Sequence, residues 1–229
     1  MASASSSPFH GTVYKCLKEC LDTEKTYIQD LEILMQYYHV LSTKQKSYSL
    51  PEGLTASKVK TIFQDIPKLL TLHQEWFPDF ERYISTGDAS VISHIVKKKM
   101  RVMRLYGDYI ITIPSAQDIT IAYEGYFNVS CMSHECCTVV LIAFFLQIKE
   151  LKEQEGIDKV LNRVLVTPFQ RITRYSLLIK ALIEEESKAS DNQVNIPALE
   201  SLLKDVNDVV DYVNKVQEAR AVKELPVRF

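Results

Sequence analysis

The sequence is poor in turn-forming residues and contains no run of apolar residues long enough to cross a membrane. It has 6 glycines and 8 prolines among 229 residues, few for a protein built from many short strands and tight turns. Its longest uninterrupted apolar run extends from Val139 to Leu146, well below the ~18 residues of a membrane span. Residues 1–8 are small and polar and lack the apolar segment of a secretory signal. These absences argue against sheet-rich, membrane-spanning and secreted proteins.

The sequence also lacks a charge imbalance, a cysteine framework and the known nucleotide-binding motifs. Its 27 basic and 29 acidic residues nearly cancel, whereas a dedicated nucleic-acid binder has a strongly basic surface. Five cysteines without framework spacing fit a reduced, cytoplasmic protein; recruitment to membrane or cytoskeleton is left open. The sequence has no phosphate-binding loop, dinucleotide fingerprint or nucleophile elbow. We therefore expect no nucleic-acid partner, no bound nucleotide and no cofactor.

Apolar residues recur with helical spacing along most of the chain, and no internal repeat is visible. The predicted fold class is all-α, an elongated bundle of long helices joined by short loops. Breaks are expected at Pro67 and Pro78 and around Pro114, and Thr167-Pro168 either begins a helix or kinks a continuous one. The predicted helices cover residues 12–41, 56–83, 91–111, 119–155 and 157–186, with a last helix from residue 197 onward.

The helix predicted around residues 165–183 has two faces of different character. At helical period, one face is an apolar stripe typical of a core. On the opposite face, two aliphatic residues lie beside a glutamine and an arginine. They are either ordinary exposed aliphatics or part of a second contact surface for a protein partner. The core face comprises Leu165, Ile172, Tyr175, Ile179, Leu182 and Ile183, and the opposite face comprises Val166, Gln170, Arg174 and Leu177.

Glu24 is the most unusual residue of the first predicted helix. It lies four residues after Cys20 and four before Ile28, within the apolar stripe. A carboxylate buried without a partner is energetically costly. One possibility is that Glu24 forms a buried ion pair or hydrogen bond with a neighbouring helix. The other is that the stripe leaves the core at this point, so that the Glu24 carboxylate is exposed and can bind a partner.

Four segments together resemble a known family. Residues 165–180 are similar to the most characteristic segment of the Dbl-homology (DH) domain, the catalytic module of Rho-family guanine nucleotide exchange factors. Thr167 stands where a lysine is usual, and Ser176 where a proline is usual. Residues 22–31, 62–76 and 209–218 resemble further DH segments, and the resemblance extends from about residue 13 to 221. The matching positions of the first segment are Leu165, Pro168, Gln170, Arg171, Arg174, Tyr175, Leu177, Leu178 and Lys180.

The resemblance implies a function and a set of GTPase-binding residues. It implies a factor that remodels the two switch segments of a Rho- or Rac-family GTPase and so releases GDP and Mg²⁺, without covalent catalysis. Glu24 would contact switch I and Asn214 switch II, and Glu218 would fall where family members select among GTPases. His73 is expected to be structural on separate grounds, because a lone histidine is most often a core or surface residue. Val166, Gln170, Arg174 and Leu177 complete the expected surface.

The implied domain organisation is a disordered leader (1–11), a DH domain (12–224) and a short tail (225–229), with no pleckstrin-homology domain in this chain. Two alternatives to exchange activity stay open. A DH-like scaffold would bind a GTPase or another protein without promoting exchange. A lipid-binding bundle would use the basic patch formed by Lys97, Lys98, Lys99, Arg101 and Arg104, which is otherwise a solvated helix face. Cys131, His134, Cys136 and Cys137 lie within seven residues, but two of the cysteines are adjacent and there is no second, distant pair, which fits a tetrahedral zinc site poorly. No metal is therefore expected.

Overall fold

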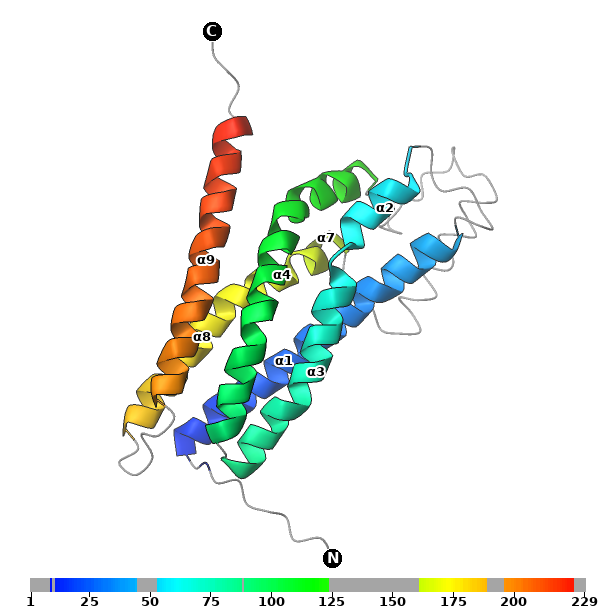
Figure 1. Cartoon of the computed structure of the whole chain (residues 1–229). Helices are drawn as coiled ribbons and strands as arrows, with labels where there is room; N and C mark the ends of the chain where they lie inside the picture. The colour runs from blue at the N-terminus through cyan, green and yellow to red at the C-terminus, as the bar shows by residue number, and fades with distance from the viewer. Residues whose placement is uncertain are drawn as a thin grey trace, which may run out of the picture. The chain divides into compact units, whose positions relative to one another are not determined.

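The structure, a computed structural model, describes residues 9, 11–44, 53–87, 89–123, 161–188 and 196–224. Within these ranges the backbone is helical apart from short turns, and no strand occurs (Figure 1). Glycine ends one helix where a left-handed backbone is needed. Gly87 follows α3 with φ of 67°, a conformation that favours glycine. The helices are α1 (Gly11–Lys44), α2 (Ala56–Phe63), α3 (Ile66–Thr86), α4 (Ala89–Ala122), α7 (Leu161–Leu165), α8 (Thr167–Lys188) and α9 (Ile196–Glu224).

The chain forms two compact units, each with its own core. Of the described residues, the first unit contains 9, 11–28, 68–87, 89–111, 168–188 and 196–224, and the second contains 29–44, 53–67, 112–123 and 161–167. The first unit therefore holds the beginning of α1, most of α3 and α4, nearly all of α8 and the whole of α9. Its core includes Leu17, Leu69, Trp76, Tyr83, Tyr106, Ile172, Tyr175, Leu199, Leu202, Val206 and Val213.

The second unit packs α2 and α7 with the remaining parts of α1 and α4. α2 begins after Thr55, whose side chain accepts a hydrogen bond from the Lys58 amide at 3.3 Å, as a helix cap does. Lys58 in turn donates to the Gly53 carbonyl and to the Tyr123 hydroxyl, at 2.8 and 3.1 Å. These bonds tie the segment before α2 to the end of α4. The buried apolar residues of this unit include Leu31, Leu34, Leu41, Leu54, Val59, Phe63, Ile66, Ile113 and Leu161.

The all-α prediction is confirmed, and several predicted breaks are corrected. Helix α3 continues through Pro78 and α4 continues through Pro114, so neither proline interrupts its helix. The break near Pro67 lies at Gln64–Asp65, and Pro67 is the second residue of α3, where its missing N–H has no intrahelical partner to lose. Thr167-Pro168 begins a helix: α8 starts at Thr167 after a turn at Val166.

Some sequence-based expectations fall outside the described part of the chain. The cluster of Cys131, His134, Cys136 and Cys137 lies there, as does most of the helix predicted over residues 119–155. The basic residues from Lys97 to Arg104 lie on α4, but their side chains are outside the described set. Among the helices that are described, none is long and apolar enough to span a membrane.

Candidate functional site

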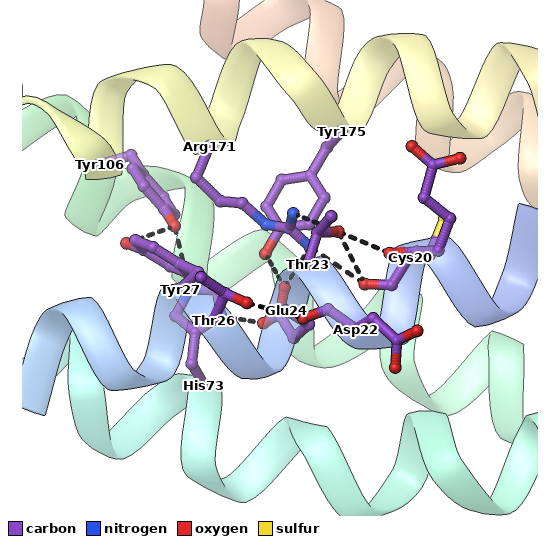
Figure 2. A network of polar contacts seen from close by, with 11 residues as sticks. Cys20, Asp22, Thr23, Glu24, Thr26, Tyr27, His73, Tyr106, Arg171 and Tyr175 are labelled. Carbon is purple, nitrogen blue, oxygen red and sulfur yellow. Dashed lines mark hydrogen bonds and ion pairs between the residues drawn. The ribbon is translucent and has the colours of Figure 1, made fainter.

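Glu24 of α1 lies at the centre of a buried polar network in the first unit. Its side chain is 0% exposed. One carboxylate oxygen, Oε1, lies 2.5 Å from Nδ1 of His73 on α3. The other, Oε2, accepts hydrogen bonds from Nη2 of Arg171 at 2.5 Å and from the Tyr175 hydroxyl at 2.7 Å, both on α8. Figure 2 shows Arg171 and Tyr175 reaching from α8 toward Glu24, with His73 approaching from the α3 side.

The network extends from His73 to two tyrosines and from Arg171 back to α1. Nε2 of His73 lies 3.0 Å from the hydroxyl of Tyr106 on α4, which lies 2.9 Å from that of Tyr27. Arg171 donates from Nη1 to the Thr23 hydroxyl at 2.9 Å. The guanidinium carbon also lies 4.3 Å from the centroid of the Tyr175 ring, within the range of a cation–π interaction. Polar groups from α1, α3, α4 and α8 are thus held in one connected arrangement.

The charge of Glu24 is retained despite its burial. Burial alone raises the pKa of this carboxyl. His73, Arg171 and the Tyr175 hydroxyl outweigh that effect through charge and hydrogen bonding, and lower the Glu24 pKa from 4.5 to about 2. Burial and the neighbouring carboxylate raise the pKa of Tyr106 well above its ordinary value. Around neutral pH the site therefore contains an ionised carboxylate that accepts hydrogen bonds from the Arg171 guanidinium and the Tyr175 hydroxyl.

This geometry decides between the two readings of Glu24. The carboxylate forms a buried ion pair and is not offered at the surface, so the expectation of an exposed acid is wrong. Both oxygens are already hydrogen-bonded, and a partner could reach them only if the network opened. His73, 2% exposed, is a core residue.

The outward face of α8 carries the predicted second surface. Gln170 and Arg174 are exposed, and 67% of the Leu177 side chain is accessible. Val166 is half-buried in the turn before α8. Gln170, Arg174 and Leu177 alternate with the buried Arg171 and Tyr175 along one helix. The bonds of these two buried residues to Glu24 therefore fix the direction in which the outward face points.

Helix α9 carries the remaining predicted contacts. Asn214 and Glu218 are exposed, while Val206 and Val213 are buried. α9 is joined to α8 by a hydrogen bond of 2.8 Å from the Ser176 hydroxyl to Oδ1 of Asn207. The structure thus leaves both predicted α9 residues accessible to a partner.

Two residues of this region were not identified from the sequence. Arg171 was read only as part of a motif, yet its spacing from Pro168 and Tyr175 places a cation within the buried stripe of α8. Arg171 in the apolar stripe of one predicted helix and Glu24 in that of another could have indicated a buried ion pair. Glu19 is exposed and lies one turn before Thr23, whose hydroxyl bonds Arg171. Glu19 is therefore an exposed acid on the same side of α1 as Thr23.

The described residues contain no group of three metal-ligating side chains that could hold an ion. The polar side chains around Glu24 bond one another. Their arrangement can hold four helical segments together and present the outward face of α8.

Known proteins resemble this chain in both sequence and structure. Residues 16–214 match the family model described as the RhoGEF domain. The chain is 24% identical over 185 residues to FYVE, RhoGEF and PH domain-containing protein 2 of Homo sapiens, which covers 79% of this chain and 26% of that protein. It is 28% identical over 201 residues to Rho guanine nucleotide exchange factor 17 of Mus musculus, which covers 85% of this chain and 9% of that protein. The chain therefore spans about a quarter or less of the length of these relatives.

Among solved structures, the crystal structure of the DH domain of FARP2 has a TM-score of 0.63 against this chain. It shares 18% sequence identity, and the match covers 95% of this chain and 97% of that one. At this identity the likeness shows the fold, a DH-type helical bundle.

Proposed function

Because this chain belongs to the RhoGEF domain family, we propose that it is a guanine nucleotide exchange factor for a small GTPase of the Rho or Rac type. The observation that supports this proposal is the outward face of α8, where Gln170, Arg174 and Leu177 are exposed. A leucine side chain that is 67% exposed beside an arginine and a glutamine is suited to a contact with apolar and polar parts.

The mechanism that we propose needs no covalent step. An exchange factor binds the nucleotide-free GTPase more tightly than the loaded form. By linkage, it then weakens nucleotide binding by the same factor. Leu177 would pack against apolar residues of switch II, while Arg174 and Asn214 would bond its polar groups in a remodelled conformation that disfavours Mg²⁺ and phosphate. Glu218, exposed on α9, would select among GTPases.

Val166 has a more limited place in this proposal. It is half-buried in the turn before α8, and only the exposed part of its side chain would be available to a GTPase. We expect its contribution to be smaller than that of Leu177, because less apolar surface is left to bury.

We assign Glu24 a positioning role in this proposal. Its carboxylate holds Arg171 and Tyr175, which orient the outward face of α8. If an acid on α1 contacts switch I, Glu19 is the better candidate. It is exposed, and it lies one turn from Thr23, the residue that bonds Arg171 of α8.

The test is release of a fluorescent GDP analogue from Rho-, Rac- and Ras-type GTPases with and without this chain. We expect acceleration for a Rho-family member. Leu177→Asp and Glu19→Ala should lower it strongly while leaving the unfolding midpoint unchanged, because both side chains are exposed. Ser187→Ala, which removes a hydroxyl bonded only within α8, is the matched control.

Other outcomes of this assay would identify other functions. Binding of a GTPase without faster GDP release would identify a scaffold. Absence of both across the panel would refute the proposal. Salt-sensitive binding to anionic vesicles without any dependence on GTPase would instead favour the lipid-binding alternative through the basic patch of α4.

A further inference from the structure

We infer that the Ser176–Asn207 hydrogen bond sets the register of α9 on α8 and thereby positions Asn214 for the exchange reaction. This inference rests on the proposed function above. The Ser176 hydroxyl donates to Oδ1 of Asn207 at 2.8 Å. Ser176 is 9% exposed and Asn207 is half-buried, so water competes weakly for this bond.

The direction of the Ser176 bond is unusual for a hydroxyl within a helix. Such hydroxyls commonly bond a carbonyl three or four residues back in their own helix. Thr173 and Ser187 on α8 do this, with bonds to the carbonyls of Gln170 and Ile183. Ser176 bonds across to α9 instead.

The other contacts between α8 and α9 include apolar side chains that line a shared pocket. Apolar packing is non-directional, and a loosely packed interface permits several arrangements of similar free energy. A small pocket of about 60 Å³, partly open to solvent, lies where these helices meet α1 and α3, so the side chains there do not fill all the space between the helices. A single buried polar contact can select one register from such alternatives, as polar residues do in coiled coils. The pocket is lined from α8 and α9 by Leu178, Ile179, Leu182, Leu199 and Leu202.

Asn214 is well placed to depend on this register. It lies seven residues after Asn207, which is close to two helical turns, so both side chains lie on the same side of α9. A displacement of α9 by one turn would move Asn214 by about 5.4 Å relative to Arg174 and Leu177. Such a displacement would separate the residues that the proposed mechanism needs together.

A second contact constrains the same segment from α4. The ring of Tyr212 lies against Gly107, where a Cβ atom would approach Cε1 of the ring to 2.9 Å. Gly107 thus provides a notch that receives Tyr212, two residues before Asn214. The hydrogen bond and the notch act on different sides of α9, and each can be altered without the other.

The decisive variant replaces both partners of the bond by apolar residues, as Ser176→Ala with Asn207→Leu. Removal of both polar groups is close to neutral for stability, whereas removal of one leaves the other without its partner. We therefore expect Ser176→Ala alone to lower stability and the double variant to recover it. The double variant should still lose about threefold or more in kcat for exchange, a factor that corresponds to one hydrogen bond, because register is not restored. KM for the GTPase should change less.

Hydrogen exchange of the α9 amides provides a readout that is independent of any GTPase. We expect faster exchange in α9 of the double variant at unchanged global stability, and no change in Ser187→Ala. Wild-type kcat together with wild-type α9 protection in the double variant would overturn the inference. The inference would also be overturned if kcat of the double variant fell only in proportion to a loss of its global stability. If the wild type accelerated no GTPase, the proposed function would fail, and α9 protection alone would decide whether the bond sets the register.

Discussion

Replacement of Glu24 by alanine should destabilise the first unit, because it removes the centre of the buried network. The change leaves Arg171 buried at 4% exposure without its carboxylate, and it removes an acceptor from His73 and Tyr175. Breaking a buried ion pair from one side costs about 3 to 5 kcal/mol. The depressed pKa measures a different quantity, the preference of the network for the ionised over the protonated carboxyl. A fall from 4.5 to about 2 corresponds to about 3 kcal/mol of preference for the ionised form.

A loss of this size is a large fraction of the stability of a typical domain, which is about 5 to 15 kcal/mol. The assay is urea unfolding followed by circular dichroism and by tryptophan fluorescence. Trp76 is the single tryptophan of the chain, and its ring centroid lies 5.8 Å from that of His73 and 5.9 Å from that of Tyr175. Its emission therefore reports on the network itself.

Two further variants separate the lost charge from lost packing. Glu24→Gln keeps the size of the side chain, and we expect it to be destabilising because a neutral amide cannot balance Arg171. Glu24→Leu combined with Arg171→Met removes both charges, and we expect it to recover much of the loss. An unchanged unfolding midpoint and unchanged Trp76 emission in Glu24→Ala would show that this carboxylate is not buried in the ion pair described here.

Three further predictions concern pH, the outward face of α8 and the notch in α4. Because the folded-state pKa of Glu24 lies below its ordinary value of 4.5, its contribution is fully present above that pH and should be lost between about pH 4.5 and 2. Urea titrations across this range should show a flatter profile for Glu24→Gln, and identical profiles would contradict the argument. Arg174→Ala should lower the rate of GDP release at least about tenfold. The unfolding free energy should change by less than about 0.5 kcal/mol, since substitutions at exposed positions are nearly neutral. A loss of stability large enough to explain the lower rate would show that Arg174 belongs to the core. Gly107→Ala should change the unfolding free energy by less than about 1 kcal/mol, because the gain in helix propensity offsets the cost of displacing the Tyr212 ring. Unfolding followed by fluorescence measures this change. A loss of several kcal/mol would show that the ring cannot move.

Much of the fold could be predicted from local periodicity. The apolar spacing that predicted helices over residues 12–41 and from 197 onward corresponds to α1 and α9. The prolines were misjudged because a helix tolerates the loss of one hydrogen bond where tertiary packing holds the flanking turns. Pro78 is exposed and Pro114 half-buried in continuous helices.

The sequence by itself determined the helical class, the family and the exposure of Gln170, Arg174 and Leu177, because these follow from periodicity and a contiguous motif. Periodicity left Glu24 undecided between a buried pair and an exposed contact, although the family resemblance assigned it a contact with switch I. Only the tertiary structure decided that question. The partners of Glu24, His73 and Arg171, lie 49 and 147 residues away in sequence, and no local pattern encodes which distant side chains meet. The same holds for Ser176 and Asn207, because a hydrogen bond between two helices depends on their packing and not on the spacing within either one.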